Sequence, residues 1–165
     1  MFLRFKKKTP ISRLSEGVEA VVKGQVVGEN KLTLSGSQTR CVYYDKISES
    51  FEHGPRGRGR RMWVPKNMEM RCSGFFIEDA SGRVWVDGNT EGFDVQGGIQ
   101  ESGTLGKGHR KRYMAQMIRS GDKVIIGGLV SKPKASEPAD LLVLRPNAKG
   151  LLKIIVRATV MTNDK

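Results

Sequence analysis

The stretch 18–28, which reads VEAVVKGQVVG, decides how this chain folds. Five of its eleven residues are valine, and β-branched residues of this kind favour strands. Gly24 lies inside the stretch and Gly28 ends it. Because a glycine within a strand marks a bend or bulge, the pattern predicts a strand that curls as strands of a small barrel must.

A tight hairpin is predicted further along the chain at 75–86, FFIEDASGRVWV. The turn-forming DASG separates two apolar strands, so we interpret Asp79 as a side chain that caps the turn rather than as half of a carboxylate pair with Glu78. Trp85 alternates with Val84 and Val86, which places it on the opposite face of its strand without saying which face is exposed.

Other segments carry the same strand signals of alternation and β-branching. They are KLTL before the turn SGSQ, RCVYYDKISES, DKVIIGGLV, LLVLRP and LLKIIVRATV. In RCVYYDKISES a period of two predicts one face made of Cys41, Tyr43 and Asp45, and another made of Val42, Tyr44 and Lys46. The Gly127-Gly128 pair in DKVIIGGLV is expected to absorb a bend.

Some segments have weaker or ambiguous patterns. The glycine-rich 89–108 is expected to be a long loop with at most one short strand, and SKPKASEPAD a proline-broken loop. YMAQMIRS fits a helical turn and a strand equally well. With scarcely any helix signal, we predict a mostly β protein: a single small OB-like antiparallel β-barrel with long basic and glycine-rich loops. The expected organisation is a basic N-terminal tail (1–10), a barrel domain (11–160) and a C-terminal tail (161–165).

The charge balance points to an anionic partner. The chain has 165 residues, with 29 Lys and Arg against 17 Asp and Glu, a formal net charge of +12 and a pI near 10.0. Such a balance favours an acidic membrane surface, an acidic protein or single-stranded nucleic acid. The oligomeric state is left open by the sequence.

Two basic clusters, HGPRGRGRR at 53–61 and KGHRKR at 107–112, are the candidate binding elements. Arginine suits phosphate contacts and an exposed tryptophan can stack on a base. The two clusters either line one rim of the barrel or form two solvated loops on opposite sides of it. Trp63 is expected to cover the core rather than to offer a free stacking face. The candidates for anion or nucleic-acid binding are Arg56, Arg58, Arg60, Arg61, Lys107, Arg110, Lys111, Arg112, Trp63 and Trp85.

Catalysis and metal binding have no pattern in their favour. His53 and His109 each sit in a basic cluster, and Cys41 and Cys72 are far apart among apolar residues, which predicts free thiols in a reducing compartment. We therefore expect no enzymatic activity, no metal and no cofactor, and the sequence identifies no small-molecule substrate. No apolar run is long enough to cross a bilayer, so we expect a cytoplasmic protein that can also act at the cytoplasmic face of a membrane.

Four segments, in order and spacing, resemble the GIDE domain, also called the beside-a-membrane (BAM) domain. They are 9–28, 32–49, 74–87 and 112–131. The matching positions are Gly24, Ser35, Gly36, Cys41, Val42, Tyr43, Tyr44, Phe75, Asp79, Gly82, Val84, Val86, Gly121, Asp122, Val124 and Gly128.

The GIDE domain occurs in membrane-anchored mitochondrial ubiquitin ligases and in bacterial and archaeal membrane proteins. The resemblance implies a non-catalytic interaction module that works beside a membrane. This chain departs from the family in lacking transmembrane segments and a zinc-binding RING, because its two cysteines and two histidines are too few and too scattered for such a finger. Ubiquitin-ligase activity is therefore not expected.

Overall fold

The protein is mostly β, as predicted, in a computed structural model that describes residues 6–53, 59–89, 91–105 and 110–157. Among these residues the helical structure is confined to one 3-10 turn, Ile11–Arg13. The strands, in chain order, are β1 Glu19–Val27, β2 Leu32–Thr33, β3 Arg40–Cys41, β4 Tyr43–His53, β5 Arg61–Cys72, β6 Phe75–Asp79, β7 Gly82–Val86, β8 Phe93–Gln96, β9 Ile99–Leu105, β10 Lys111–Ile118, β11 Lys123–Ser131, β12 Val143–Arg145 and β13 Leu152–Arg157.

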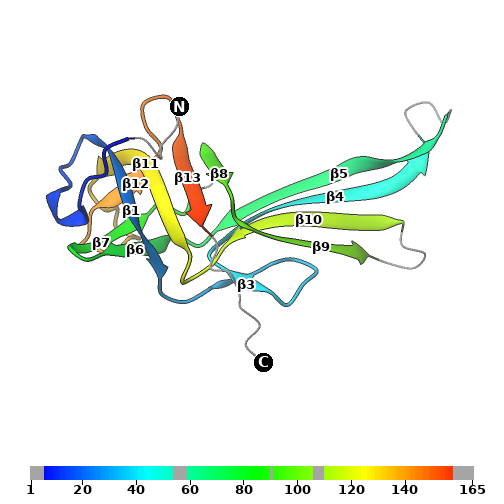
Figure 1. The fold of residues 1–165 in the computed structure, drawn as a ribbon, viewed down its shortest axis with the longest axis horizontal. Helices are drawn as coiled ribbons and strands as arrows, with labels where there is room; N and C mark the ends of the chain where they lie inside the picture. Colours follow the sequence, from blue (N-terminus) through cyan, green and yellow to red (C-terminus); the bar gives the residue numbers. More distant parts are fainter. Residues whose placement is uncertain (1–5, 54–58, 90, 106–109, 158–165) are drawn as a thin grey trace.

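Five strands close into a small barrel (Figure 1). Around the barrel they run β1-β6-β7-β12-β11, and β11 pairs back to β1 along seven residues, from Glu19↔Leu129 to Gln25↔Lys123. The predicted OB-like barrel is confirmed, since this is the Greek-key order of the five-stranded OB-fold. The barrel is not entirely antiparallel as predicted, because β7 and β12 pair in parallel. Outside the barrel, β8 and β13 also form a parallel pair.

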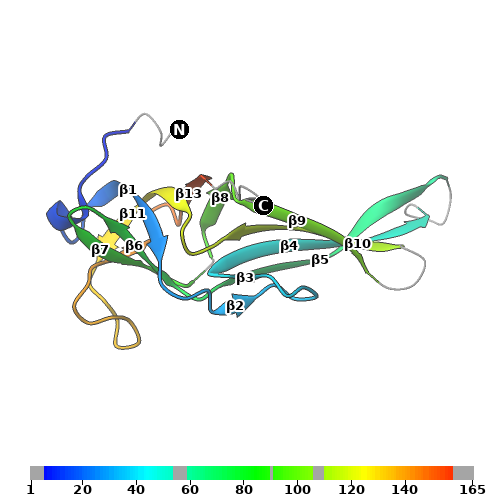
Figure 2. The same cartoon turned by 60° about the horizontal axis from the view of Figure 1, so that its bottom comes forward.

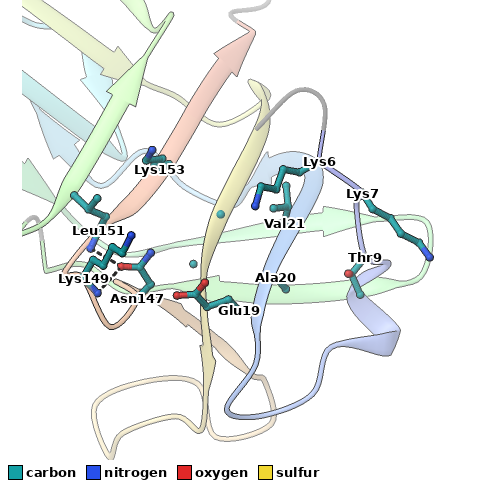
Figure 3. Close-up of a pocket in the computed structure, with 12 residues that line it drawn as sticks. Lys6, Lys7, Thr9, Glu19, Ala20, Val21, Asn147, Lys149, Leu151 and Lys153 are labelled. Atoms are coloured by element: carbon teal, nitrogen blue, oxygen red, sulfur yellow. Dashed lines mark hydrogen bonds between the residues drawn. The ribbon is translucent and has the colours of Figure 1, made fainter. Parts of the chain in front are cut away.

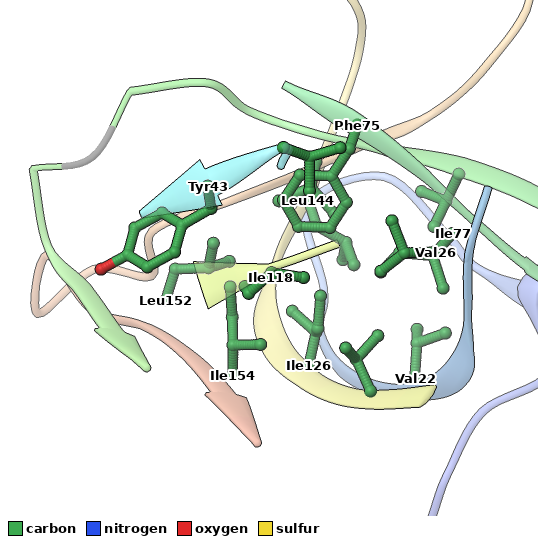
Figure 4. Packing of buried hydrophobic residues seen from close by; sticks show 14 of the residues in the cluster. Val22, Val26, Tyr43, Phe75, Ile77, Ile118, Ile126, Leu144, Leu152 and Ile154 are labelled. Carbon is green, nitrogen blue, oxygen red and sulfur yellow. The ribbon is translucent and has the colours of Figure 1, made fainter. Parts of the chain in front are cut away.

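The barrel core is mostly aliphatic, and its buried cluster also contains the aromatic rings of Tyr43 and Phe75 (Figure 4). Val22 and Val26 of β1 face Ile77 and Ile126 there, all at 0 to 1% exposure. Gly24 lies where β1 passes from β11 to β6, and a Cβ at this position would come within 2.5 Å of the Ile77 Cγ2 atom and 2.7 Å of the Glu78 carbonyl oxygen. The predicted bend therefore needs glycine.

A second sheet, ordered β5-β4-β10-β9, extends away from the barrel and is called the arm (Figures 1 and 2). It is built from two hairpins that are inserted into different connections of the barrel. The hairpin β4–β5 comes between β1 and β6, and β9–β10 comes between β7 and β11. The two hairpins are joined because β4 pairs with β10 over eight residues, from Tyr43↔Ile118 to Ser50↔Lys111.

The arm has two different faces. The covered face carries Tyr44, Lys46 and Met117, which are buried beneath the small hairpin of β2 and β3, where Leu34 and Cys41 complete an apolar cluster. The other face, called the open face, carries partly or largely exposed apolar side chains. They are Ile47, Phe51, Trp63, Met68, Met70 and Met114.

Several expectations for this region need correction. The segment 89–108 holds two strands, β8 and β9, rather than a loop with at most one. YMAQMIRS, which was ambiguous, belongs to strand β10. The predicted alternation breaks at Val42, between β3 and β4, so Cys41 packs with Tyr44 and Val42 packs with Tyr43. The cause is a change of direction between the two strands, which a period of two cannot include.

Candidate anion-binding site at the end of the arm

The described residues of the two basic clusters meet at the far end of the arm. The N–H of Phe51 donates to the carbonyl of Arg110 at 2.7 Å, and His53 pairs with Arg61 at the last rung of β4–β5. The ends of both hairpins therefore lie beside each other, away from the barrel (Figure 1). This corrects both earlier placements, because the described basic residues are neither on the barrel rim nor on opposite sides of it.

Two segments of the sequence, each spanning the connection of one hairpin, contain most of the excess charge of the chain. The segments 49–66 and 104–112 contain nine Lys and Arg residues but two Glu residues, a formal +7 of the total +12. Arg60, Arg61, Arg110 and Lys111 are exposed, and no carboxylate among the described residues pairs with them. The remaining candidates Arg56, Arg58 and Lys107, together with His109, lie outside the described residues.

Trp63 and Arg112 lock the two hairpins together. The guanidinium carbon of Arg112 lies 4.1 Å from the centre of the Trp63 ring, and Phe51 packs on the same ring at 5.2 Å between centroids. Arg112 also donates to Glu49 at 2.8 Å. Because these residues come from β4, β5 and β10, they form a clamp across three strands. Trp63 is thus packed, as expected, but on the arm rather than over a core.

Trp85 is not part of this end of the molecule. Val84 and Val86 point into the barrel, and Trp85 lies half-buried on its outer surface. Its ring packs edge-on against Phe76 at 4.6 Å, and Phe76 also faces the Arg83 guanidinium at 5.2 Å. Arg83 in turn pairs with Glu78 at 2.8 Å. The structure therefore separates the two tryptophans that the sequence grouped as stacking candidates.

A second basic hollow on the barrel has no counterpart in the sequence analysis. Lys6, Lys7, Lys149 and Lys153 surround a hollow of about 450 Å³ over the outer surface of β1 and β11 (Figure 3). Its floor is open because Gly127, which pairs with both Val21 and Lys153, has no side chain. Lys153 lies on β13, whereas Lys6 and Lys7 come from the segment before β1 and Lys149 from the connection between β12 and β13. Because these segments are far apart in the sequence, no local motif could have revealed the hollow.

The side chains that could take part in chemistry, Asp79, Cys41 and Cys72, have structural roles instead. Asp79 Oδ1 accepts from the Ser81 N–H at 2.7 Å and the Gly82 N–H at 3.0 Å, so its predicted role in capping the turn is confirmed. Cys41 and Cys72 are free thiols, and burial raises their pKa values to about 11 and about 12. Such thiols carry little thiolate at neutral pH and are poor nucleophiles.

A buried polar cluster fastens the hairpin of β2 and β3 to the covered face. The Lys46 ammonium donates to the Ser35 carbonyl at 2.6 Å, and Glu69 accepts from the Tyr44 hydroxyl at 2.6 Å and the Ser35 hydroxyl at 2.8 Å. On the other side, Glu101 accepts from the Tyr113 hydroxyl at 2.8 Å. A lysine between two hydrogen-bonded glutamates satisfies the buried charges, so we assign this cluster to stability.

Comparisons with protein-family models, with curated proteins and with solved structures gave no significant match. In the part of the chain that the structure describes, no helix is long and apolar enough to span a bilayer. Within that same part, no three or more His, Cys, Asp or Glu side chains gather as a metal site would require.

Proposed function

We propose that this protein is a non-catalytic binding module that resembles the GIDE domain and binds an anionic partner through the end of its arm. The observation that carries the proposal is the pairing of β4 with β10, which brings the basic ends of two hairpins together. Arg60, Arg61, Arg110 and Lys111 then present four exposed cations on a support stiffened by the clamp. Planar guanidinium groups favour phosphate and carboxylate as partners.

The resemblance to the GIDE domain supports an acidic phospholipid surface as the partner, in the cytoplasm beside a membrane. Cations of a polybasic segment each contribute about 1 kcal/mol of attraction to such a surface. Four of them, with Phe51 and Trp63 on the same end of the arm, combine charge with side chains that suit a membrane interface.

The test measures binding at low salt to vesicles with and without acidic phospholipid. The variant replaces Arg60, Arg61, Arg110 and Lys111 with glutamine. A matched control removes the same number of exposed charges elsewhere, at Arg13, Lys31, Lys123 and Arg157. We expect the first variant to lose most of the binding and the control to keep most of it. Equal losses would mean that net charge alone causes the binding.

Single-stranded nucleic acid is a second candidate partner, and one observation on the barrel favours it. β6 and β7 are the second and third strands of the OB-like order, the surface on which OB-folds bind oligonucleotides. Phe76, Trp85 and Arg83 lie on the outside of these strands. A protein with Trp63→Phe leaves Trp85 as its single tryptophan, so quenching of its fluorescence by an oligonucleotide would support this candidate. Vesicle binding without quenching would support the first.

A further inference from the structure

The open face of the arm is an apolar surface that no described element covers. Met68 is 70% exposed, Met114 46%, Met70 38% and Phe51 36%. Ile47 lies between Met68 and Met114 on one rung, and Met70 is on the next open-face rung toward the barrel. Phe51 lies farther out, beyond the rung of Glu49 and Arg112. Contiguous exposed apolar patches of this kind mark interaction sites, and methionine side chains adapt well to a partner surface.

The base of the open face is acidic. A hollow of about 240 Å³ lies there between the arm and β8, and its lining includes Asp45, Asp94, Met70 and Phe93. Asp45 accepts from the Tyr43 hydroxyl at 2.9 Å, and no described cation forms an ion pair with either Asp45 or Asp94.

The far end of the same face is basic. His53 and Arg61 form its last rung, next to Phe51 and Trp63. The open face therefore runs from carboxylates at the base, through methionines and then the Glu49–Arg112 ion pair, to Phe51, Trp63 and cations at the end. A surface with this order is complementary to a copy of itself turned end to end.

We infer that two copies of this chain associate through their open faces, with the arms antiparallel. A two-fold axis near Glu49 would place Arg61 and His53 of one copy over Asp45 and Asp94 of the other. Met68 and Met114 would then contact Phe51 and Trp63 of the other copy. A two-fold interface uses the same patch on both copies, and sheets pack face to face about 10 Å apart with strands nearly aligned.

The association is expected to be weak. From Asp45 to His53 the face is about 27 Å long, and the arm is about 15 Å wide, so each copy buries roughly 400 Å². The total of roughly 800 Å² is below the range of stable specific interfaces and falls within that of weak, transient ones. At physiological ionic strength the repulsion between two basic chains is screened beyond about 8 Å, whereas contacts within the interface are less affected.

The first test is sedimentation of the full chain over a hundredfold range of concentration at physiological ionic strength. The mass should rise from 18.3 kDa toward twice that value. Replacing Met68 and Met114 with glutamate should keep the protein monomeric at every concentration. Met62→Glu is the matched control, since Met62 is 50% exposed but lies on the opposite face. It should behave as the wild type does.

A charge exchange tests the orientation of the two copies. Arg61→Asp and Asp94→Arg should each weaken association at least tenfold, because each puts like charges opposite one another. The double variant should recover most of the affinity. A wild type that stays at 18.3 kDa would overturn the inference, as would loss of association in Met62→Glu. Because these assays contain no lipid or nucleic acid, their outcome is independent of the proposed anion binding.

Discussion

At the scale of single residues, Glu69 shows how one carboxylate holds an element in place. The hydrogen bond from Tyr44, followed by that from Ser35, lowers the pKa of Glu69 from its ordinary value of 4.5. A carboxyl group whose pKa is lower in the folded state stabilises the fold above its unfolded pKa, and this stability is lost as the pH falls through the folded pKa. Glu69→Gln should therefore cost on the order of 1 kcal/mol at neutral pH and close to nothing in strong acid.

Urea unfolding of the wild type and Glu69→Gln at several pH values measures this difference. Glu52→Gln is the control on the same arm, because Glu52 forms an exposed ion pair with Lys66 at 2.5 Å, and such pairs contribute little. If the loss in Glu69→Gln were the same at neutral and acid pH, the charge of Glu69 would not be what stabilises the hairpin.

At the scale of elements, the clamp of Trp63, Phe51 and Arg112 should keep the two hairpins of the arm together. Trp63→Ala removes an aromatic contact and a cation–π contact, each worth about 1 kcal/mol. Since the clamp lies far from the barrel core, we expect faster amide exchange in the distal halves of β4, β5 and β10, with a change in melting temperature of at most a few degrees. Val64→Ala is the control, as Val64 is on the other face of β5. Exchange that rose equally in the barrel would show that the arm and barrel unfold together.

Elements with a strong local pattern could be predicted from the sequence. The valines of β1 and the apolar run of β11 each indicate a strand without reference to the rest of the chain. The residues around Asp79 indicate a hairpin turn in the same way. β9 could not be predicted, because IQESGTL is mostly polar. It is the edge strand of the arm and is held by backbone pairing with β10, from Ile99↔Met117 to Leu105↔Lys111. Pairing through backbone hydrogen bonds does not require an alternating pattern of apolar side chains, so this strand could not be recognised from the sequence.

At the scale of the whole molecule, the barrel was predictable and the arm was not. Short β-branched strands that are interrupted and separated by glycines indicate a small closed sheet. They do so without indicating the order of its strands. The arm depends on pairing between β4 and β10, which joins Glu49 to Arg112 across 63 positions of sequence. No local motif encodes this pairing. The sequence therefore identified both basic clusters but could not place them beside each other.

The central claim is that the basic ends of the two hairpins form one binding site. Its most direct test compares two double variants. One carries Arg60→Gln and Arg61→Gln on the first hairpin, and the other carries Arg110→Gln and Lys111→Gln on the second. For each, the logarithm of the association constant with the preferred anionic partner is plotted against the logarithm of salt concentration. One shared site predicts that both pairs reduce the slope by similar amounts, about 0.7 per lost contact for single-stranded nucleic acid. A slope that changes for one pair alone would contradict the account.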